Sequence, residues 1–326
     1  MAETIKVGII GYGNLGRGAE LAIKQQRDME LVAVFSRRGK VNTFDEHIPS
    51  YHIDEVEKFT DKIDVMILCG GSATDLPEQT PHFSTLFNTV DSYDTHAKIP
   101  EHFAAVNEAA EKAGKVSVIS VGWDPGLFSI NRVMAEAVLA EGNTYTFWGK
   151  GLSQGHSDAV RRVEGVKNGV QYTLPSEAAM DRVRNGENPN LATAEKHKRE
   201  CYVVLEDGAS ADEVAHTIKT MPNYFDEYET EVHFITEEEL LRDHSAMPHG
   251  GFVIHSGKTG AGSNQIVEFS LKLDSNPEFT ASVLVAYARA AHRLSQEGQV
   301  GAKTVYDIGP GYIHPDSPAD LRKKYL

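Results

Sequence analysis

The chain has 326 residues, of which 40% are hydrophobic and 24% charged, and its formal net charge at pH 7 is −15. This length and composition predict about two globular domains and exclude a disordered chain. The acidic surplus excludes non-specific binding to nucleic acid or anionic membranes, but it is compatible with a local basic pocket. No apolar run reaches the ~18 residues of a membrane-spanning helix. Two cysteines, Cys69 and Cys201, are too few for a disulfide framework or a thiolate zinc site, so we expect reduced thiols in the cytoplasm.

The first 125 residues alternate between strand-like and helix-like segments. Continuous runs of apolar and often β-branched residues, separated by helices, are typical of a parallel sheet that is buried on both faces. We therefore expect a Rossmann-type, doubly wound sheet over residues 1–125. The expected strands are 7–10, 31–35, 64–69, 88–90 and 116–120, and the expected helices are 15–26 and 100–113, the latter ending at Gly114.

After Gly126 the pattern changes to strand-like segments separated by long polar stretches, which predicts an α+β domain with a mostly antiparallel sheet over residues 126–275. An alanine-rich amphipathic helix over 280–296 indicates close packing, and we expect the region 276–326 to join the first domain. The expected strands are 144–148, 201–205, 231–235, 251–255 and 265–272; helices are expected over 128–139 and within 315–326, and a helix followed by a loop over 178–200.

A G-x-G-x-x-G motif, Gly11-Tyr12-Gly13-Asn14-Leu15-Gly16, follows the first strand and opens the first helix. In this context the first glycine permits a tight turn, the second lets the backbone approach a pyrophosphate, and the third lets helix and strand pack closely. The helix N-terminus then faces the phosphate charge. The motif predicts a dinucleotide site rather than a glycine-rich turn without a ligand.

The end of the second strand indicates which dinucleotide is bound. An NAD site usually has a carboxylate there, which binds the ribose hydroxyls. This chain has Ser36, Arg37 and Arg38 instead. A hydroxyl and two guanidinium groups suit a 2′-phosphate, so we expect NADP, although both arginines could be ordinary surface charges.

Polar clusters follow the next three strands of this sheet, where ligands of open α/β sheets bind. They are residues 69–75, 91–94 and 122–126. We interpret Asp75 and Asp91 as turn or helix-cap residues. Asp94 and Asp124 are better placed to hold an ammonium group near the nicotinamide, although an aspartate beside a Gly-Pro turn is often only a turn former.

The second domain contains three loops that could bind an anion, at residues 153–158, 197–199 and 247–251, and each could also be an ordinary solvated loop. The sequence contains no cluster with metal-ligand spacing and no serine nucleophile elbow. We therefore expect no metal, and hydride chemistry supplied by the cofactor.

Long and uncommon strings match a known family at residues 11–17, 35–38, 69–78, 91–94, 122–132, 146–151, 153–162, 170–175, 197–201, 247–251 and 276–280. The chain resembles the NADP-dependent diaminopimelate dehydrogenase family, and the match is weakest over 39–59, 177–194 and the C-terminal tail. The resemblance implies reversible oxidative deamination of meso-2,6-diaminopimelate at its D-centre, in lysine biosynthesis. The products would be L-2-amino-6-oxopimelate, which cyclises to tetrahydrodipicolinate, and ammonia. It also implies a homodimer, with substrate binding and dimerisation in the second domain.

The resemblance assigns roles to individual residues. Asp94 and Asp124 would lie at the reacting D-centre, where they or, less favoured, His156 would accept the ammonium proton. Trp148, Gln154 and Gly155 would line the substrate cavity, and Thr173, Arg199, His249 and Asn276 would hold the distal L-centre. With the motifs above, the expected cofactor-binding residues are Gly11, Tyr12, Gly13, Asn14, Leu15, Gly16, Ser36, Arg37, Arg38, Cys69, Gly70, Gly71, Ser72, Ala73, Thr74, Ser92, Tyr93, Trp123, Asp124, Pro125 and Gly126.

Two other functions are compatible with these residues. One is an NADP-dependent dehydrogenase that acts on a different amino or hydroxy diacid. The other is a nucleotide-sensing regulator without turnover, but no helix-turn-helix is apparent and the net charge is strongly negative.

Overall fold

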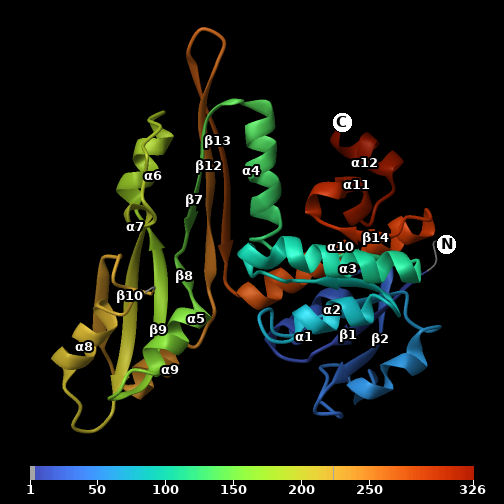
Figure 1. Ribbon diagram of the computed structural model, residues 1–326, viewed down its shortest axis with the longest axis horizontal. Coiled ribbons are helices and arrows are strands. Elements are labelled where there is room, and N and C mark those ends of the chain that lie inside the picture. Colours follow the sequence, from blue (N-terminus) through green and yellow to red (C-terminus); the bar gives the residue numbers. More distant parts are fainter. Residues whose placement is uncertain (1–3, 223) are drawn as a thin grey trace. The chain divides into compact units, whose positions relative to one another are not determined.

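A computed structural model describes residues 4–222 and 224–326 (Figure 1). The chain divides into two compact units. Unit 1 combines the N-terminal part, up to Ile130, with the C-terminal segment Pro277–Leu326, and unit 2 is the continuous segment Asn131–Asn276. The helix α4 (Leu127–Val138) begins in unit 1 and ends in unit 2, because the division falls after Ile130.

Unit 1 is built on a seven-stranded sheet with the order β14-β6-β5-β4-β1-β2-β3. Every neighbouring pair is parallel, which confirms the predicted doubly wound fold. The last strand of the chain pairs with β6, so residues far apart in the sequence complete one sheet. The strands are β1 (Ile5–Ile10), β2 (Met29–Ser36), β3 (Ser50–His52), β4 (Val65–Leu68), β5 (Asn88–Asp91), β6 (Val116–Val118) and β14 (Gly301–Lys303).

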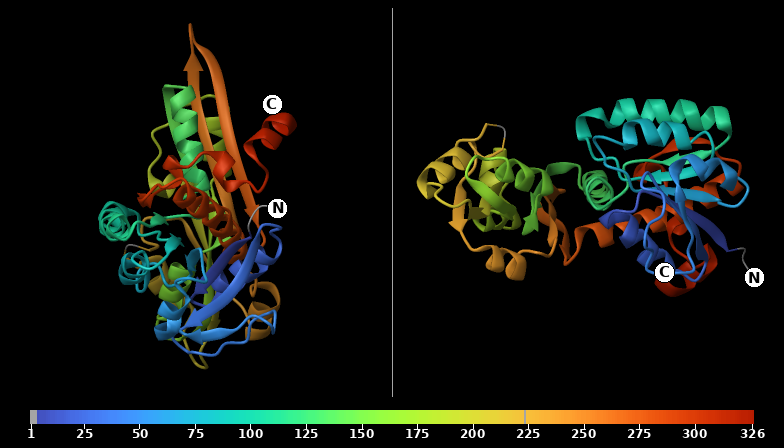
Figure 2. Two further views of the ribbon diagram at one scale, coloured as in Figure 1. Left: turned by 90° about the vertical axis from the view of Figure 1, so that its right-hand side faces the viewer. Right: turned by 90° about the horizontal axis from the view of Figure 1, so that it is seen from below.

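Helices cover both faces of this sheet (Figure 2, right). On one face, α1 (Asn14–Lys24) and α10 (Asn276–Gln296) bury a cluster with Val7, Ile9 and Ile67. The alanines of α10 allow close packing, because a Cβ on Gly18 of α1 would lie 3.0 Å from the Cβ of Ala281. The other face is covered by the 3₁₀ helix η1 (Ile53–Phe59), by α2 (Leu76–Phe83) and by α3 (Ile99–Ala113), preceded by η2 (His96–Lys98).

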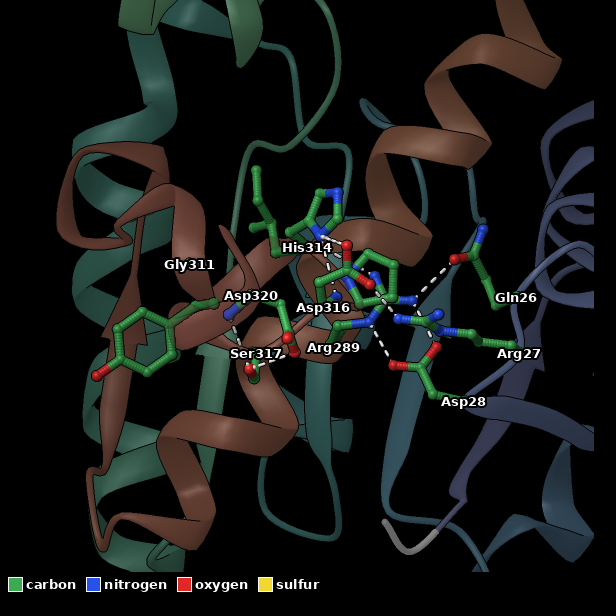
Figure 3. A network of polar contacts seen from close by, with 12 residues as sticks. Gln26, Arg27, Asp28, Arg289, Gly311, His314, Asp316, Ser317 and Asp320 are labelled. Atoms are coloured by element: carbon green, nitrogen blue, oxygen red, sulfur yellow. Dashed lines mark hydrogen bonds and ion pairs between the residues drawn. The ribbon is translucent and has the colours of Figure 1, made fainter. Parts of the chain in front are cut away.

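The last residues of the chain are fastened to α10 by Arg289 and Arg293, and Figure 3 shows the contacts of Arg289. Arg289 is 1% exposed; its Nε and Nη2 each donate to the Asp28 carboxylate at 2.7 Å, and its Nη1 donates to the carbonyl of Ile313 at 2.8 Å. Arg293 donates to the carbonyl of His314 at 2.7 Å. These bonds hold the chain end, which contains η3 (Val305–Asp307), α11 (Pro310–Ile313) and α12 (Pro318–Tyr325), against unit 1.

Unit 2 contains two sheets. Three antiparallel strands have the order β13-β12-β7, and four strands have the order β11-β10-β9-β8, in which only the β10–β11 pair is parallel. The strands are β7 (Glu141–Trp148), β8 (Gly151–Leu152), β9 (Val166–Pro175), β10 (His197–Leu205), β11 (Thr230–Phe234), β12 (His249–Thr259) and β13 (Ser263–Leu273). The helices are α5 (Gln154–Arg161), α6 (Glu177–Arg184), α7 (Thr193–Lys196), α8 (Ala211–Lys219) and α9 (Glu237–Asp243).

Two predictions for unit 2 need correction. The expected loop up to residue 200 is wrong at its end, because His197–Glu200 already belong to β10 and pair with β9. The strand β9 was not predicted, since Asn168, Gly169 and Gln171 interrupt its apolar pattern. Gln171 is nevertheless fully buried, because β9 and β10 are the two central strands of the four-stranded sheet and Gln171 lies on β9.

The ion pair between Arg289 and Asp28 predicts the effect of Asp28→Asn. Burial would raise the pKa of Asp28, but the hydrogen bonds and charge of Arg289 outweigh it and hold the pKa below its ordinary value. The substitution leaves a buried guanidinium without its counter-ion, so the free energy of unfolding should fall by about 3–5 kcal/mol in urea denaturation. Because pairing lowers the pKa, this stabilisation is present at neutral pH and is lost as the pH falls through the folded-state pKa.

Arg27 provides the control, because it forms an ion pair with Asp316 but its side chain is 67% exposed. Arg27→Gln should cost only about 0.2–1 kcal/mol. Equal losses for Asp28→Asn and Arg27→Gln would contradict the role given to the buried pair.

Candidate functional site

The glycine motif adopts the geometry that a nucleotide loop requires. Gly11 has a φ of +90°, and a Cβ at Gly16 would lie 2.1 Å from the Gly11 carbonyl oxygen. By contrast, a Cβ at Gly13 would meet nothing within 4 Å, which leaves open space beside the backbone. Gly13 is also the N-cap of α1, and the first turn of that helix carries no acidic residue. The start of α1 is therefore suited to bind an anion.

A cavity of about 290 Å³ lies at this end of the sheet. It brings together many of the predicted cofactor residues, together with Ile53 and Gln79, which were not predicted. The Oε1 of Gln79 is buried without a hydrogen-bond partner among the described residues, as expected of a group that awaits a ligand. Only its helical spacing from Asp75 could have indicated it. The predicted residues in the lining are Gly11, Tyr12, Gly13, Ser36, Arg37, Arg38, Cys69, Gly70 and Gly71.

The other predicted cofactor residues do not line this cavity. They are Asn14, Leu15, Gly16, Ser72, Ala73, Thr74, Ser92, Tyr93, Trp123, Asp124, Pro125 and Gly126. The side chain of Tyr12 points inward, where its hydroxyl donates to the buried Glu20, so its backbone is the part that can face a ligand. Burial, with Glu20 beside it, raises the pKa of Tyr12 to about 12. Burial alone raises the pKa of the Cys69 thiol to about 12, so this cysteine is not a nucleophile.

The two arginines after β2 are held at the cavity. The Nη2 of Arg38 donates to the carbonyl of Tyr12 at 3.2 Å, and its backbone N–H donates to Ser36 Oγ at 3.1 Å. The Nη1 of Arg37 lies 3.1 Å from Asp75 Oδ1. Asp75 precedes α2, but its carboxylate accepts from the N–H of Gly71 at 2.9 Å and does not cap the helix. A turn role for Asp75 agrees with the structure, and a side-chain cap does not.

Asp94 and Asp124 follow β5 and β6, which are neighbours in the sheet. Asp94 is exposed, and its N–H donates to Ser72 Oγ at 2.9 Å, which joins two strand-end loops. Asp124 is half-buried in a tight turn, since a Cβ on Gly126 would lie 1.8 Å from the Gly122 carbonyl oxygen. The ring of Trp123 is buried edge-on against Phe128, with 5.2 Å between ring centroids.

In unit 2, Thr173 and Arg199, which the resemblance assigns to the L-centre, lie in one row with Gly151. Gly151, Thr173 and Arg199 are opposite one another on β8, β9 and β10. The His249 imidazole packs over Gly151, where a Cβ would lie 2.4 Å from Nδ1. Beside this row, the Trp148 ring is stacked on His197, with centroids 5.2 Å apart.

Met247 connects two more of the predicted substrate residues, Gln154 and Asn276, to this region. It precedes the His249 strand, its sulfur accepts from Gln154 Nε2 at 3.3 Å, and its carbonyl accepts from the Asn276 N–H at 3.0 Å. Gln154 and Gly155 are exposed at the start of α5, while Asn276 is half-buried. The three loops that seemed separate in the sequence thus belong to one region of unit 2.

Arg199 is a buried cation without a counter-ion. It is 7% exposed, its Nη1 donates to Thr173 Oγ1, and its guanidinium lies 4.1 Å from the centroid of the Tyr228 ring. Its Nε has no partner, and no carboxylate forms an ion pair with it among the described residues. Burial lowers its pKa. Since an unpaired buried charge is costly, this arrangement indicates an anion-binding site. Tyr228 was not predicted, because its proximity to Arg199 depends on the fold.

Two histidines near this cation are neutral. Burial, assisted by the charge of Arg199, lowers the pKa of His156 and of His197 to about 4. In agreement, Nε2 of His197 accepts a hydrogen bond from the Trp148 N–H at 2.8 Å. An imidazole with such a pKa is a weaker base than an ordinary histidine, so it does not carry the positive charge near neutral pH.

Across residues 4–222 and 224–326, no group of three or more His, Cys, Asp or Glu side chains is arranged to hold a metal ion. Over the same residues, no helix has the length and apolar character needed to cross a membrane.

The parallel sheet, its glycine loop and the two guanidinium groups at the second strand define an NADP-dependent oxidoreductase. The glycine cradle, the cavity and the unpartnered Gln79 oxygen all fit that cofactor. Comparisons with known proteins identify the family.

Residues 122–275 match a family model described as the diaminopimelic acid dehydrogenase C-terminal domain, and residues 2–76 match one described as a CoA binding domain. The chain is 69% identical to the meso-diaminopimelate D-dehydrogenase of Lysinibacillus sphaericus, over 99% of this chain and 100% of the relative. It belongs to the meso-diaminopimelate D-dehydrogenase family.

Two solved structures are also similar. One is a sixfold variant of the meso-diaminopimelate dehydrogenase of Clostridium tetani E88 with diaminopimelate, at 54% identity and a TM-score of 0.93, covering 99% of this chain and all of that one. The other is an engineered D-amino acid dehydrogenase bound to NADP+, at 50% identity and a TM-score of 0.86, with the same coverage.

The charge of Arg199 predicts the titration of its two histidine neighbours. In the wild-type protein, NMR titration should show His156 and His197 protonating at about pH 4. Arg199→Met removes the cation that disfavours their charged forms, so both pKa values should rise while remaining below the ordinary value of 6.5, because burial persists. Lys198→Met is the control, since Lys198 is exposed and paired with Glu229. Unchanged pKa values in Arg199→Met would show that its charge does not reach these rings.

Proposed function

We propose that the protein catalyses the reversible, NADP-dependent oxidative deamination of meso-2,6-diaminopimelate at its D-centre. The products are L-2-amino-6-oxopimelate and ammonia. The observation that carries this proposal is Arg199, a buried guanidinium with an unused Nε donor and, among the described residues, no carboxylate partner. It is suited to bind the carboxylate at the non-reacting end of a diacid substrate.

The chain holds the cofactor through backbone and charge. We assign the pyrophosphate to the Gly11–Gly13 backbone and the start of α1, and the 2′-phosphate to Ser36, Arg37 and Arg38. Bound there, NADP+ supplies the hydride acceptor of the reaction. The engineered D-amino acid dehydrogenase, which is 50% identical to this chain, is bound to NADP+, and this supports NADP+ as the cofactor.

The L-centre of the substrate is assigned to Thr173, Arg199, His249 and Asn276, with Trp148, Gln154 and Gly155 lining the cavity. The Clostridium tetani variant supports this choice. Its six substitutions are Q154L, T173I, R199M, P248S, H249N and N276S, and the replaced residue at each number is also the residue of this chain. Fixing the distal centre orients a substrate that carries two amino-acid groups, so that the D-centre is the one that reacts.

Asp94 and Asp124 are assigned to the reacting centre. Hydride loss from Cα requires a neutral amine, so a local group must accept an ammonium proton or pass it to water. The two carboxylates at the ends of neighbouring strands can hold the ammonium group and receive that proton. A carboxylate can also attract the ammonium ion electrostatically, which the neutral imidazole of His156 cannot do.

We also propose a cytoplasmic homodimer in which unit 2 provides the interface. Val133, Met134 and Val138 of α4 are exposed apolar residues, as are Ile266 and Val267 of β13. β13 is an edge strand of 11 residues whose outer edge is unpaired in its sheet. Edges and patches of this kind are usually covered in the assembled protein. The two free thiols agree with a reducing compartment.

The function is tested by NADP+ reduction with meso-, LL- and DD-diaminopimelate in parallel. The meso isomer should be oxidised with release of ammonia, because it alone presents a D-centre to the cofactor and an L-centre to Arg199. Asp94→Asn and Asp124→Asn should each lower kcat/KM by about 10²–10⁴-fold while NADPH binding stays nearly intact.

Equal rates with all three isomers, or no ammonia, would favour a dehydrogenase of another diacid. Near-wild-type turnover in both aspartate variants would make Asp94 and Asp124 structural turn residues, even if the meso isomer is the substrate.

Cofactor choice is tested by replacing Arg37 and Arg38 together with glutamine. A charge-assisted contact to phosphate contributes roughly 1.5–3 kcal/mol, so KM for NADP+ should rise by about 10–150-fold while KM for NAD+ changes little. Asp75→Asn is a useful control, because it removes the partner of Arg37 and leaves both guanidinium groups in place. An equal rise in KM for both cofactors would contradict the assignment of the 2′-phosphate.

A further inference from the structure

Asp91, at the end of β5, is a fully buried carboxylate with four hydrogen-bond donors. The Thr80 hydroxyl and the His102 Nε2 each lie 2.7 Å from its Oδ2. The N–H groups of Tyr93 and Ser120 donate to its Oδ1 at 3.0 and 2.8 Å. The contact with Tyr93 is that of a turn residue, as predicted, but the other three contacts show a larger role.

The two oxygens of this carboxylate face different parts of unit 1. Oδ2 receives side chains from α2 and α3, whereas Oδ1 receives backbone groups from the loops after β5 and β6. The same loops carry Asp94 and Asp124. The ring of His102 is also stacked on Tyr93, with centroids 4.1 Å apart. Asp91 therefore links the two helices to the two loops.

One of these loops is held in a strained conformation. Among the described residues, Ser120 alone has a positive φ, +57°, without being glycine. Its Oγ is buried and has no partner among the described residues, so its side chain does not compensate for the strain. The Asp91 carboxylate, by contrast, binds its N–H. Such strain persists only where the surroundings enforce it, and it occurs often at functional sites.

We propose that Asp91, together with Thr80 and His102, is a positioning element that fixes the loops carrying Asp94 and Asp124. This inference rests on the roles proposed above for those two carboxylates. Thr80 and His102 orient the Asp91 carboxylate, and the carboxylate in turn fixes the backbone at residues 93 and 120. They act through the loops and contact neither substrate nor cofactor.

A second buried cluster on the same elements allows a matched control. Ser84, the C-cap residue of α2, donates to the Thr80 carbonyl at 2.6 Å, and its hydroxyl lies 2.8 Å from Ser117 Oγ of β6. Ser117 in turn bonds Thr89 of β5 at 2.9 Å. This cluster is equally buried between α2, β5 and β6, but within the described part of the chain it makes no hydrogen bond to the loops after the two strands.

The test compares Thr80→Val and His102→Leu with Ser84→Ala. Four quantities are measured: the thermal midpoint, Kd for NADP+, kcat with its primary deuterium isotope effect, and amide hydrogen exchange at residues 92–94 and 119–126. All three variants should lower the thermal midpoint. Only Thr80→Val and His102→Leu should speed exchange in the loops, lower kcat by about 10–100-fold and raise the isotope effect. Kd for NADP+ should change by a smaller factor than kcat, because the cavity at the glycine loop and the arginines after β2 is untouched. His102→Gln should restore most of kcat, because its amide can still donate to Asp91.

The proposal is overturned if Thr80→Val and His102→Leu behave like Ser84→Ala, with loop exchange and kcat at wild-type levels. If His102→Leu does not fold, Thr80→Val and His102→Gln still decide the question. A wild-type protein that does not reduce NADP+ with meso-diaminopimelate would overturn the proposed function instead, and loop exchange would still show whether Asp91 positions the loops.

Discussion

The backbone after β1 approaches the start of α1 so closely that no side chain fits between them. A Cβ on Gly16 would overlap the carbonyl oxygen of Gly11, while the space beside Gly13 stays open. The first turn of α1 starts beside the cavity, and its N-cap residue, Gly13, has no side chain with which to cap it. The segment after β2 contributes Arg37 and Arg38 to the same cavity, and the segment after β4 contributes Gly70 and Gly71.

Three buried groups, Arg289, Asp91 and Arg199, differ in how well their hydrogen-bonding capacity is satisfied. Arg289 has a bidentate carboxylate partner, and Asp91 has four donors, so both are fully satisfied. Arg199 has one hydroxyl, an aromatic ring and an unpartnered Nε. Satisfied charges of this kind hold a fold together, whereas an unsatisfied one indicates a missing ligand. The comparison within one chain therefore separates the structural charges from the one that we assign to substrate.

Features that depend on neighbouring residues could be predicted from the sequence. The glycine loop, the β1–α1 unit and the left-handed Gly114 after α3 were predicted because each depends on local backbone geometry. Features that depend on pairing across the fold could not. Gln79 meets the cavity through α2, Tyr228 lies under Arg199, and Asp91 collects donors from four separate elements. A short motif contains no information on contacts between residues so far apart in the chain.

The discontinuous composition of unit 1 has a consequence for the order in which the chain can fold during synthesis. Its sheet starts with β1 and is completed by β14, and Arg289 and Arg293 bind carbonyls at residues 313 and 314. Unit 2 is continuous, so all its strands exist before the C-terminal segment has been made. A nascent chain thus contains every residue of unit 2 while the seven-stranded sheet of unit 1 still lacks its edge strand, β14, and one of the helices that cover it, α10. Unit 1 can therefore be completed only in the last stage of translation.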